Sequence, residues 1–243
     1  MNDEEASRRD RILAQLYPDG GDRELGVQRL GEVCVEVTGA SGAGVMLMSG
    51  DIRHGSVITT DAVSTLIEDL QFTLGEGPCV DAYRQDLPVL EPDLVRPATV
   101  RWVAFTPPAI EAGARAVFGF PLQVGTVRLG ALNLYCDRPH ALSDDQFADA
   151  LVMAGLTAQA LLIMQAKAPP GQLDAELDAA SDLRLVVQQA SGMVAVQSGI
   201  SVAQALIRLR GQAFAEGRPL DDIAQAVVDR QLRFDPESDG TNP

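Results

Sequence analysis

Four arginines toward the C-terminal end of the chain have the chemistry to contact a nucleic acid. They are Arg184, Arg208, Arg210 and Arg218. A guanidinium group is planar and permanently charged, so it can bind phosphate oxygens or stack on an unpaired base. The alternative is that these side chains form only the solvated surfaces of helices. In either case the chemistry depends on the helices that position them.

Cys79 is the side chain with the clearest potential for redox chemistry. It follows Gly75-Glu-Gly-Pro78, where the glycines predict a tight turn and the proline suits a first helical position. A helix N-terminus lowers the pKa of a thiol and could create a redox-responsive thiolate. The alternative is a small apolar side chain that packs the turn. Cys34 and Cys136 fall in apolar segments, where we expect inert thiols.

Trp102 and Phe105 are the aromatic candidates for a small-molecule site, as a lid over a sheet. The alternative places both on the apolar face of a helix over residues 101–112 that packs into the core. We expect Pro107-Pro108 to break or kink this helix. His54 and His140 have no partner at metal-ligand spacing, so the sequence predicts no metal site and leaves the cofactor unknown.

Charge and composition narrow the class of protein. The net charge of −15 argues against a protein that holds nucleic acid by bulk electrostatics. Residues 182–235 contain six acids and six bases, so this segment repels phosphate least. An odd number of cysteines, three, predicts reduced thiols and a cytoplasmic protein. We expect no membrane span, since no apolar run reaches roughly 18–20 residues.

The pattern of elements predicts a mixed α+β domain followed by an all-helical one. Strands are expected over the following residues: 44–49, 52–60, 88–90, 114–124 and 127–136. Helices are expected over 22–38 and 62–74, the latter with Leu66, Ile67 and Leu70 facing inward. A long helix is expected from Ser143, which forms a capping-box pattern with Gln146, to about 165. The predicted domains are an N-terminal tail (1–21), a mixed domain (22–165), a linker (166–172), a helical domain (173–235) and a disordered tail (236–243).

Three short helices are expected in the C-terminal domain. Gly199 ends the first, Ser201 caps the second and Pro219 opens the third. The inner faces expected for the second and third helices are Ala205, Leu206, Leu209 and Ala213, and Leu220, Ile223, Ala224 and Val227. An apolar stripe runs from Leu177 to Val194 on the first helix. Because that stripe exceeds what two short helices can cover, we expect a homodimer.

Small residues and leucines recur in a specific frame over residues 183–232. The frame consists of Gln189-Ala-Ser-Gly-Met193, Ser198-Gly-Ile-Ser201, Ala205, Leu209-Arg210, Ala213, Arg218-Pro-Leu220 and Ile223-Ala224. It resembles the ANTAR module, the three-helix RNA-binding unit of transcription antitermination regulators. The resemblance implies that Arg210 and neighbouring polar residues face RNA. The family has lysine where this chain has Ser191, and often a basic or aromatic residue where it has Gly211-Gln212.

Residues 22–165 carry a second set of motifs. These are Leu74-Gly-Glu-Gly-Pro-Cys79, Ala116-Val-Phe-Gly-Phe-Pro-Leu122 and Arg128-Leu-Gly-Ala-Leu-Asn-Leu-Tyr135. They resemble a GAF domain, a small-molecule sensor fold. The resemblance implies a six-stranded antiparallel sheet with flanking helices, and a domain that senses a small molecule, a redox state or a partner protein.

Together the two resemblances imply an RNA-binding antitermination regulator that is not an enzyme. The partners that they imply are RNA hairpins in a nascent transcript. One alternative is a dimeric signalling module without RNA binding, which Ser191 and the locally zero charge favour. Another is a thiol-dependent methionine sulfoxide reductase of the GAF type. That activity needs two thiols close in space, and the three cysteines fall in different predicted elements.

Overall fold

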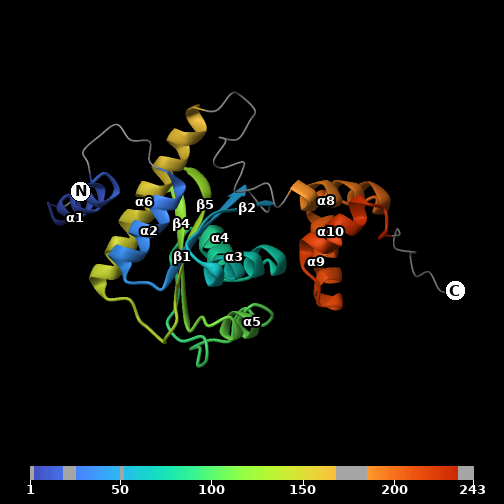
Figure 1. Cartoon of the computed structure of the whole chain (residues 1–243), viewed down its shortest axis with the longest axis horizontal. Helices are drawn as coiled ribbons and strands as arrows, with labels where there is room; N and C mark the ends of the chain where they lie inside the picture. Colours follow the sequence, from blue (N-terminus) through green and yellow to red (C-terminus); the bar gives the residue numbers. More distant parts are fainter. Residues whose placement is uncertain (1–2, 19–25, 50–51, 168–184, 235–243) are drawn as a thin grey trace. The chain divides into compact units, whose positions relative to one another are not determined.

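A computed structural model describes residues 3–18, 26–49, 52–167 and 185–234 of the chain, whose path is shown in Figure 1. The contacts between residues divide the chain into two compact units, residues 1–180 and 181–243. Each unit has its own core, so each is described by itself.

The first unit is built on an antiparallel sheet of strand order β2-β1-β5-β4-β3. The strands are β1 (Gly42–Ser49), β2 (Ile52–Thr59), β3 (Val89–Glu91), β4 (Ala116–Val124) and β5 (Val127–Cys136). The expectation of six strands was wrong for the described residues, which contain five. The central β4–β5 hairpin turns at Gly125, whose φ of +60° is a conformation that glycine adopts without strain.

One face of the sheet carries the main hydrophobic core. Alternate residues of the two central strands, such as Phe118 and Leu132, point to this face, which α2 (Val27–Thr38) and α6 (Asp144–Lys167) cover (Figure 1). Ser143 and Gln146 form the predicted cap of α6, since each side chain bonds the other's backbone N–H. Length and composition alone would let α6 cross a membrane, but half of its apolar window is buried in this unit, as expected of a core helix.

The opposite face of the sheet is covered by α3 (Ala62–Leu74) and α4 (Pro78–Gln85) (Figure 1). A short helix, α5 (Thr106–Glu111), follows the loop after β3. The predicted helix over 101–112 was therefore too long. Pro107 and Pro108 lie in the first turn of α5 instead of kinking a longer helix, because first-turn N–H groups have no helical partner to lose.

The N-terminal segment is more than a tail. Helix α1 (Asp3–Leu16) adds Ile12 and Leu16 to the core, with exposed fractions of 0% and 3%. Arg8 binds the carboxylates of Asp145 and Asp149 on α6, at 2.8 and 2.7 Å. Most residues of this helix are polar or charged, so its buried apolar side was not predicted from the sequence.

The second unit consists of α8 (Leu185–Ser198), α9 (Val202–Glu216) and α10 (Leu220–Val228). Its turns are those that the sequence predicts: Gly199 has a φ of +66°, and Ser201 forms a capping box with Gln204. The predicted inner faces of α9 and α10 are buried, namely Ala205, Leu206, Leu209 and Ala213, with Leu220, Ile223, Ala224 and Val227. Leu177, Leu183 and residues 168–172 and 236–243 lie outside the described residues; α6 itself continues through 166–167.

Candidate functional sites

A polar cluster lies inside the first unit, between the sheet and α3. Glu68 and Gln71 of α3 are fully buried, whereas Leu66, expected to face inward, is 41% exposed. Glu68 packs over Gly44 of β1, where an added Cβ would lie 2.7 Å from the Glu68 Cγ. The Ser56 hydroxyl of β2 donates a hydrogen bond to Glu68 Oε2 at 3.3 Å. A carboxylate is thereby held against the sheet in the interior.

Asn133 of β5 lies in the same row of the sheet as Gly44 and Gly119, its partners on β1 and β4. The two glycines leave room for the groups above them, which are Glu68 over Gly44 and the Pro78 carbonyl over Gly119. Cys79, the next residue, donates its N–H to Gln71 Oε1 at 2.7 Å, and its Sγ is 4.0 Å from Glu68 Oε1. Residues from α3, α4 and β5 therefore converge on one buried region.

Two amides in this region have hydrogen-bonding capacity that the described residues do not use. Asn133 is 0% exposed, and neither its side-chain oxygen nor its nitrogen has a partner there. The nitrogen of Gln71 is in the same situation. A buried polar group left unsatisfied costs about 1–3 kcal/mol, so these amides are poised to bind a water molecule or a polar ligand. A group with both a donor and an acceptor would match Asn133.

Cys79 does lie at a helix N-terminus, as predicted, but its thiol is not activated. It is 0% exposed, and burial raises its pKa well above the ordinary value of 9.0. The negative charge of Glu68 raises the pKa further. Burial likewise raises the pKa of Cys34 to about 12. The pKa of Cys136 is also raised, mainly by burial. Of the two alternatives for Cys79, its burial favours the packing side chain over the redox-responsive thiolate, because desolvation opposes the effect of the helix terminus on the pKa.

Trp102 and Phe105 are buried packing residues in this structure, with exposed fractions of 6% and 0%. The Trp102 indole donates a hydrogen bond to Asp81 of α4 at 2.8 Å, and the two rings meet edge to face with centroids 6.0 Å apart. Trp102 has a φ of +53°, which is rare for a bulky residue and has to be held by its surroundings. The Glu76 Oε1 atom accepts a hydrogen bond from the backbone N–H of Phe105 at 2.8 Å. The pair braces the loop before α5 against α4.

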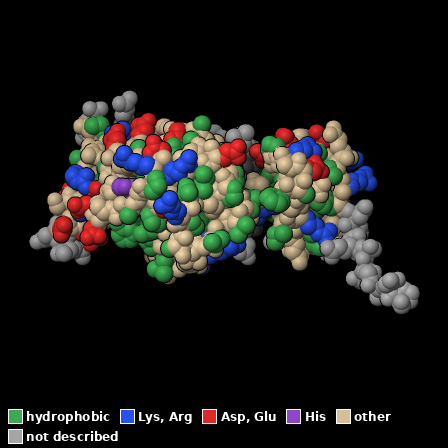
Figure 2. Space-filling view, turned by 90° about the horizontal axis from the view of Figure 1, so that it is seen from below, with side chains coloured by type: hydrophobic (Ala, Val, Ile, Leu, Met, Phe, Trp, Pro, Cys, Tyr) green, Lys and Arg blue, Asp and Glu red, His purple; other side chains and the backbone are tan. Residues whose placement is uncertain are grey.

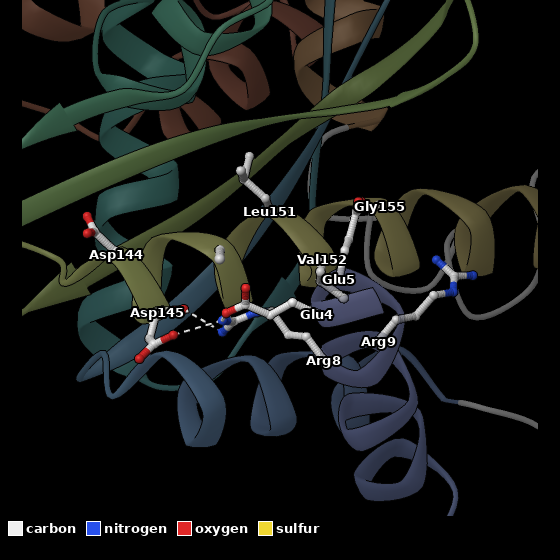
Figure 3. A pocket seen from close by; sticks show the side chains of 10 residues that line it. Glu4, Glu5, Arg8, Arg9, Asp144, Asp145, Leu151, Val152 and Gly155 are labelled. Carbon is white, nitrogen blue, oxygen red and sulfur yellow. Dashed lines mark hydrogen bonds and ion pairs between the residues drawn. The ribbon is translucent and has the colours of Figure 1, made fainter. Parts of the chain in front are cut away.

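A groove of about 520 Å³ lies between α1 and α6, and Figure 3 shows its lining. Its charged wall consists of Glu4, Glu5, Arg8, Arg9, Asp144 and Asp145. Its apolar floor includes Leu151, Val152 and Gly155 of α6. The ion pairs of Arg8 with Asp145 and Asp149 cross this region and raise the pKa of the guanidinium above its already high value. No sequence pattern predicted this groove, because its two walls come from helices that are far apart in the chain.

The structure places the four candidate arginines in different environments. Arg210, expected to be exposed, is only 8% exposed, so that expectation was wrong. Arg208 is half-buried on α9, and Arg218 is exposed and pairs with Glu216 at 2.8 Å. Arg184 lies outside the described residues. Ser191, 2% exposed, donates its hydroxyl to the Val187 carbonyl at 2.7 Å, so this departure from the family pattern falls in the interior.

The outer face of α9 carries residues that the sequence analysis did not single out. Ile207 is 65% exposed and Phe214 is 68% exposed. Gly211 lies between them, at the i, i+4 and i+7 spacing of one helix face. That spacing, opposite the predicted inner face, was the available signal. Figure 2 shows hydrophobic and basic side chains close together on the surface of the C-terminal unit, at the right of the view.

The antiparallel sheet with an enclosed polar region, joined to a small helical unit, defines a two-domain sensor and effector protein. Comparison with protein families agrees: residues 27–162 match the GAF domain and residues 175–228 match the ANTAR domain. The chain belongs to the GAF domain family and carries an ANTAR domain after its GAF domain. It is therefore an RNA-binding antitermination regulator with a signal-sensing domain.

Several solved structures are similar to the chain at low sequence identity. A GAF domain of a phosphoenolpyruvate-protein phosphotransferase from Coxiella burnetii is 17% identical, with a TM-score of 0.47, over 67% of this chain and 97% of that chain. The corresponding domain from Acinetobacter is 10% identical, with a TM-score of 0.46, over 70% and 99%. A domain of a putative sensor histidine kinase from Sinorhizobium meliloti 1021 is 18% identical, with a TM-score of 0.46, over 57% and 89%. No curated protein matches the chain.

Proposed function

We propose that this regulator binds hairpins of a nascent transcript through its ANTAR domain and so prevents a competing terminator from forming. Holding one RNA fold removes it from the equilibrium with the other, which is mass action. The observation that supports this function best is the match of residues 175–228 to the ANTAR domain, together with the buried inner faces that make these helices a folded unit. Arg208 and Arg218 are the arginines that we assign to phosphate contacts, whereas Arg210 has a packing role.

The experiment is a selection from cellular RNA with the full chain, at low and at physiological salt. A shortened chain that ends at Lys167 lacks the ANTAR domain and serves as the control. We expect hairpins to be enriched by the full chain at both salt concentrations and lost with the shortened chain. Enrichment of RNA without regard to its fold, abolished at physiological salt, would indicate bulk electrostatic binding and contradict the proposal.

We propose in addition that the regulator acts as a homodimer. Two ANTAR domains in one particle would bind two hairpins together and gain avidity without a new contact. The exposed apolar side chains Leu151 and Ile163 on α6, at 44% and 59%, are compatible with such an assembly. Light scattering coupled to gel filtration tests this proposal. A mass equal to one chain over the whole concentration range would contradict it. The same result would also contradict the alternative of a dimeric signalling module without RNA binding.

For the GAF domain, we propose that the cluster around Asn133 takes a small polar ligand. The side-chain oxygen and nitrogen of Asn133 and the side-chain nitrogen of Gln71, which have no partner among the described residues, support this assignment. The ligand class is a compound with adjacent hydrogen-bond donor and acceptor groups. A screen of polar metabolites by thermal shift tests it, with Asn133→Leu as the matched control. A compound that raises the melting temperature of both proteins equally would not be bound at this cluster.

The proposed regulator acts on transcripts in the cytoplasm and catalyses no reaction. The burial of Cys34, Cys79 and Cys136 supports this assignment over a thiol-dependent reductase, because buried thiols with raised pKa values are poor nucleophiles. An assay of free methionine sulfoxide reduction checks it. Turnover by the unmodified chain that is lost in Cys79→Ser would contradict a purely regulatory role.

A further inference from the structure

Gly211 is a glycine in the middle of α9 that the packing of the chain does not require. An added Cβ at this position would meet no atom within 4 Å. Gly211 is exposed, and it lacks the positive φ that makes glycine necessary at Gly199 and Gly217. Glycine is a poor helix former, so its presence here weakens α9 without an internal benefit. Such a position is typical of a backbone that another molecule approaches closely.

Two large apolar side chains flank this open backbone. Ile207 lies one turn before Gly211, and Phe214 lies nearly one turn after it, on the same side of the helix. Both are about two-thirds exposed, at 65% and 68%, although α9 already has a complete inner face. An exposed phenylalanine beside an exposed glycine forms a platform on which a flat group can lie.

The charges around this platform favour a negatively charged partner. Helix α9 contains Arg208 and Arg210 but a single acid, Glu216, within a chain whose net charge is −15. Glu216 accepts hydrogen bonds from Gln212 at 2.6 Å and from Arg218 at 2.8 Å. Its carboxylate is therefore paired with Arg218, and the other charged side chains of α9 are the two arginines, Arg208 and Arg210. A flat group attached to phosphates matches this combination.

We infer that Phe214 stacks on an unpaired base in the loop of the RNA hairpin, while the bare backbone at Gly211 lets that base approach and Ile207 covers its edge. The inference rests on the RNA-binding function of the ANTAR domain and assigns loop reading to the exposed Phe214 and not to Arg210, which lies one turn before it on α9 and is buried. Aromatic side chains bind unpaired bases through their faces, whereas bases inside a duplex are not available for stacking. The platform therefore recognises looped RNA and not fully paired RNA.

The test measures the binding of the full chain to two RNA probes at physiological salt. One probe is a pool of hairpins with a constant stem and a randomised loop, and the other is the same stem as a blunt duplex. We expect Phe214→Ala to weaken hairpin binding roughly tenfold or more and Phe214→Trp to retain it. Binding to the duplex, which depends on phosphate contacts, is expected to be unchanged in both variants.

A second pair of variants separates stacking from folding. Gly211→Ala is expected to raise the stability of α9, and Gly211→Leu to leave it intact, because both side chains enter open space. Gly211→Leu is nevertheless expected to weaken hairpin binding by blocking the platform. Val196→Ala is the matched control, since Val196 is an exposed apolar residue, at 86%, on the neighbouring helix α8. It should leave hairpin binding unchanged.

The outcomes distinguish this inference from the function on which it rests. If the unmodified chain binds neither probe, RNA binding itself fails. If it binds hairpins and the Phe214 and Gly211→Leu variants bind them equally well, RNA binding stands and the stacking platform is overturned. If Phe214→Ala leaves RNA affinity unchanged but lowers the mass of the particle in solution, the face joins protein to protein and the inference is likewise overturned.

Discussion

The two domains distribute polarity in opposite ways. The GAF domain buries hydrogen-bonding groups, such as Glu68 and Asn133, where apolar side chains would pack more stably. The ANTAR domain instead exposes Ile207 and Phe214, where polar side chains would be better solvated. Each arrangement costs stability when the protein is alone. The comparison indicates that the first domain is built for a ligand inside it, and the second for a partner that lies on its surface.

The sharpest test of this contrast compares two glycines. In the GAF domain, a Cβ on Gly119 would lie 2.6 Å from the Pro78 carbonyl carbon, so Gly119→Ala should destabilise the domain by about 3 kcal/mol. In the ANTAR domain, Gly211→Ala should stabilise α9 by about 0.5–1 kcal/mol. Urea unfolding measures both. Similar effects of the two substitutions would contradict the contrast between a crowded interior position at Gly119 and an open surface position at Gly211.

A second test concerns the two arginines of the ANTAR domain that differ most in burial. Arg210→Ala should destabilise this domain by about 2 kcal/mol, because its long side chain is 8% exposed and packs within the unit. Arg218→Ala, on the surface, should change stability by less than about 0.5 kcal/mol. Thermal unfolding followed by helical circular dichroism checks this order. Equal losses would mean that Arg210 contributes no more to the fold than a surface charge.

A third, smaller effect is expected at the buried amide. Asn133→Leu removes two unpaired polar atoms and keeps a similar shape, so in ligand-free protein it should be neutral or stabilising by about 1 kcal/mol. Chemical unfolding of the purified protein measures it. A loss of more than about 2 kcal/mol would show that the Asn133 amide already has a partner in solution, such as a bound water.

The mildest effect is expected in the alkaline range. The folded protein keeps Cys34 and Cys79 protonated above their ordinary pKa of 9.0, since burial raises both pKa values. The unfolded chain therefore releases these protons first. The contribution of the two thiols to stability should be fully present below about pH 9 and should fall as pH rises through the pKa of about 12 for Cys34. Unfolding measured against pH checks this, with Cys34→Ala as the variant that should show a shallower fall.

The sequence predicted turns and helix caps well because these depend on local chemistry. Ser143, Gly199 and Ser201 act as expected, since a cap or a left-handed glycine needs only its immediate neighbours. The burial of polar residues was not predictable in the same way. Glu68 and Gln71 occur in a helix whose apolar pattern points elsewhere, and their burial depends on the glycines of strands far along the chain.

The candidate site was recovered only in part for the same reason. Cys79 was found at its helix terminus, but the dominant effect on its pKa comes from burial, which no local pattern encodes. Arg210 was assigned to the surface from a family frame, whereas the packing of three helices encloses it. The exposed pair on α9, Ile207 and Phe214, follows from its spacing opposite the inner face of the helix, so a local pattern does encode it.

The ion pairs between α1 and α6 also bear on the order in which the parts of the GAF domain fold during synthesis. Arg8 and Asp149 are separated by 141 positions in the chain, so α1 can pair with α6 only after the residues between them have been synthesised. Contacts between such distant segments close late in folding. On the ribosome, the GAF domain therefore reaches its finished core only after most of its length has been translated. The ANTAR helices, with their short turns, assemble from near neighbours and follow without delay.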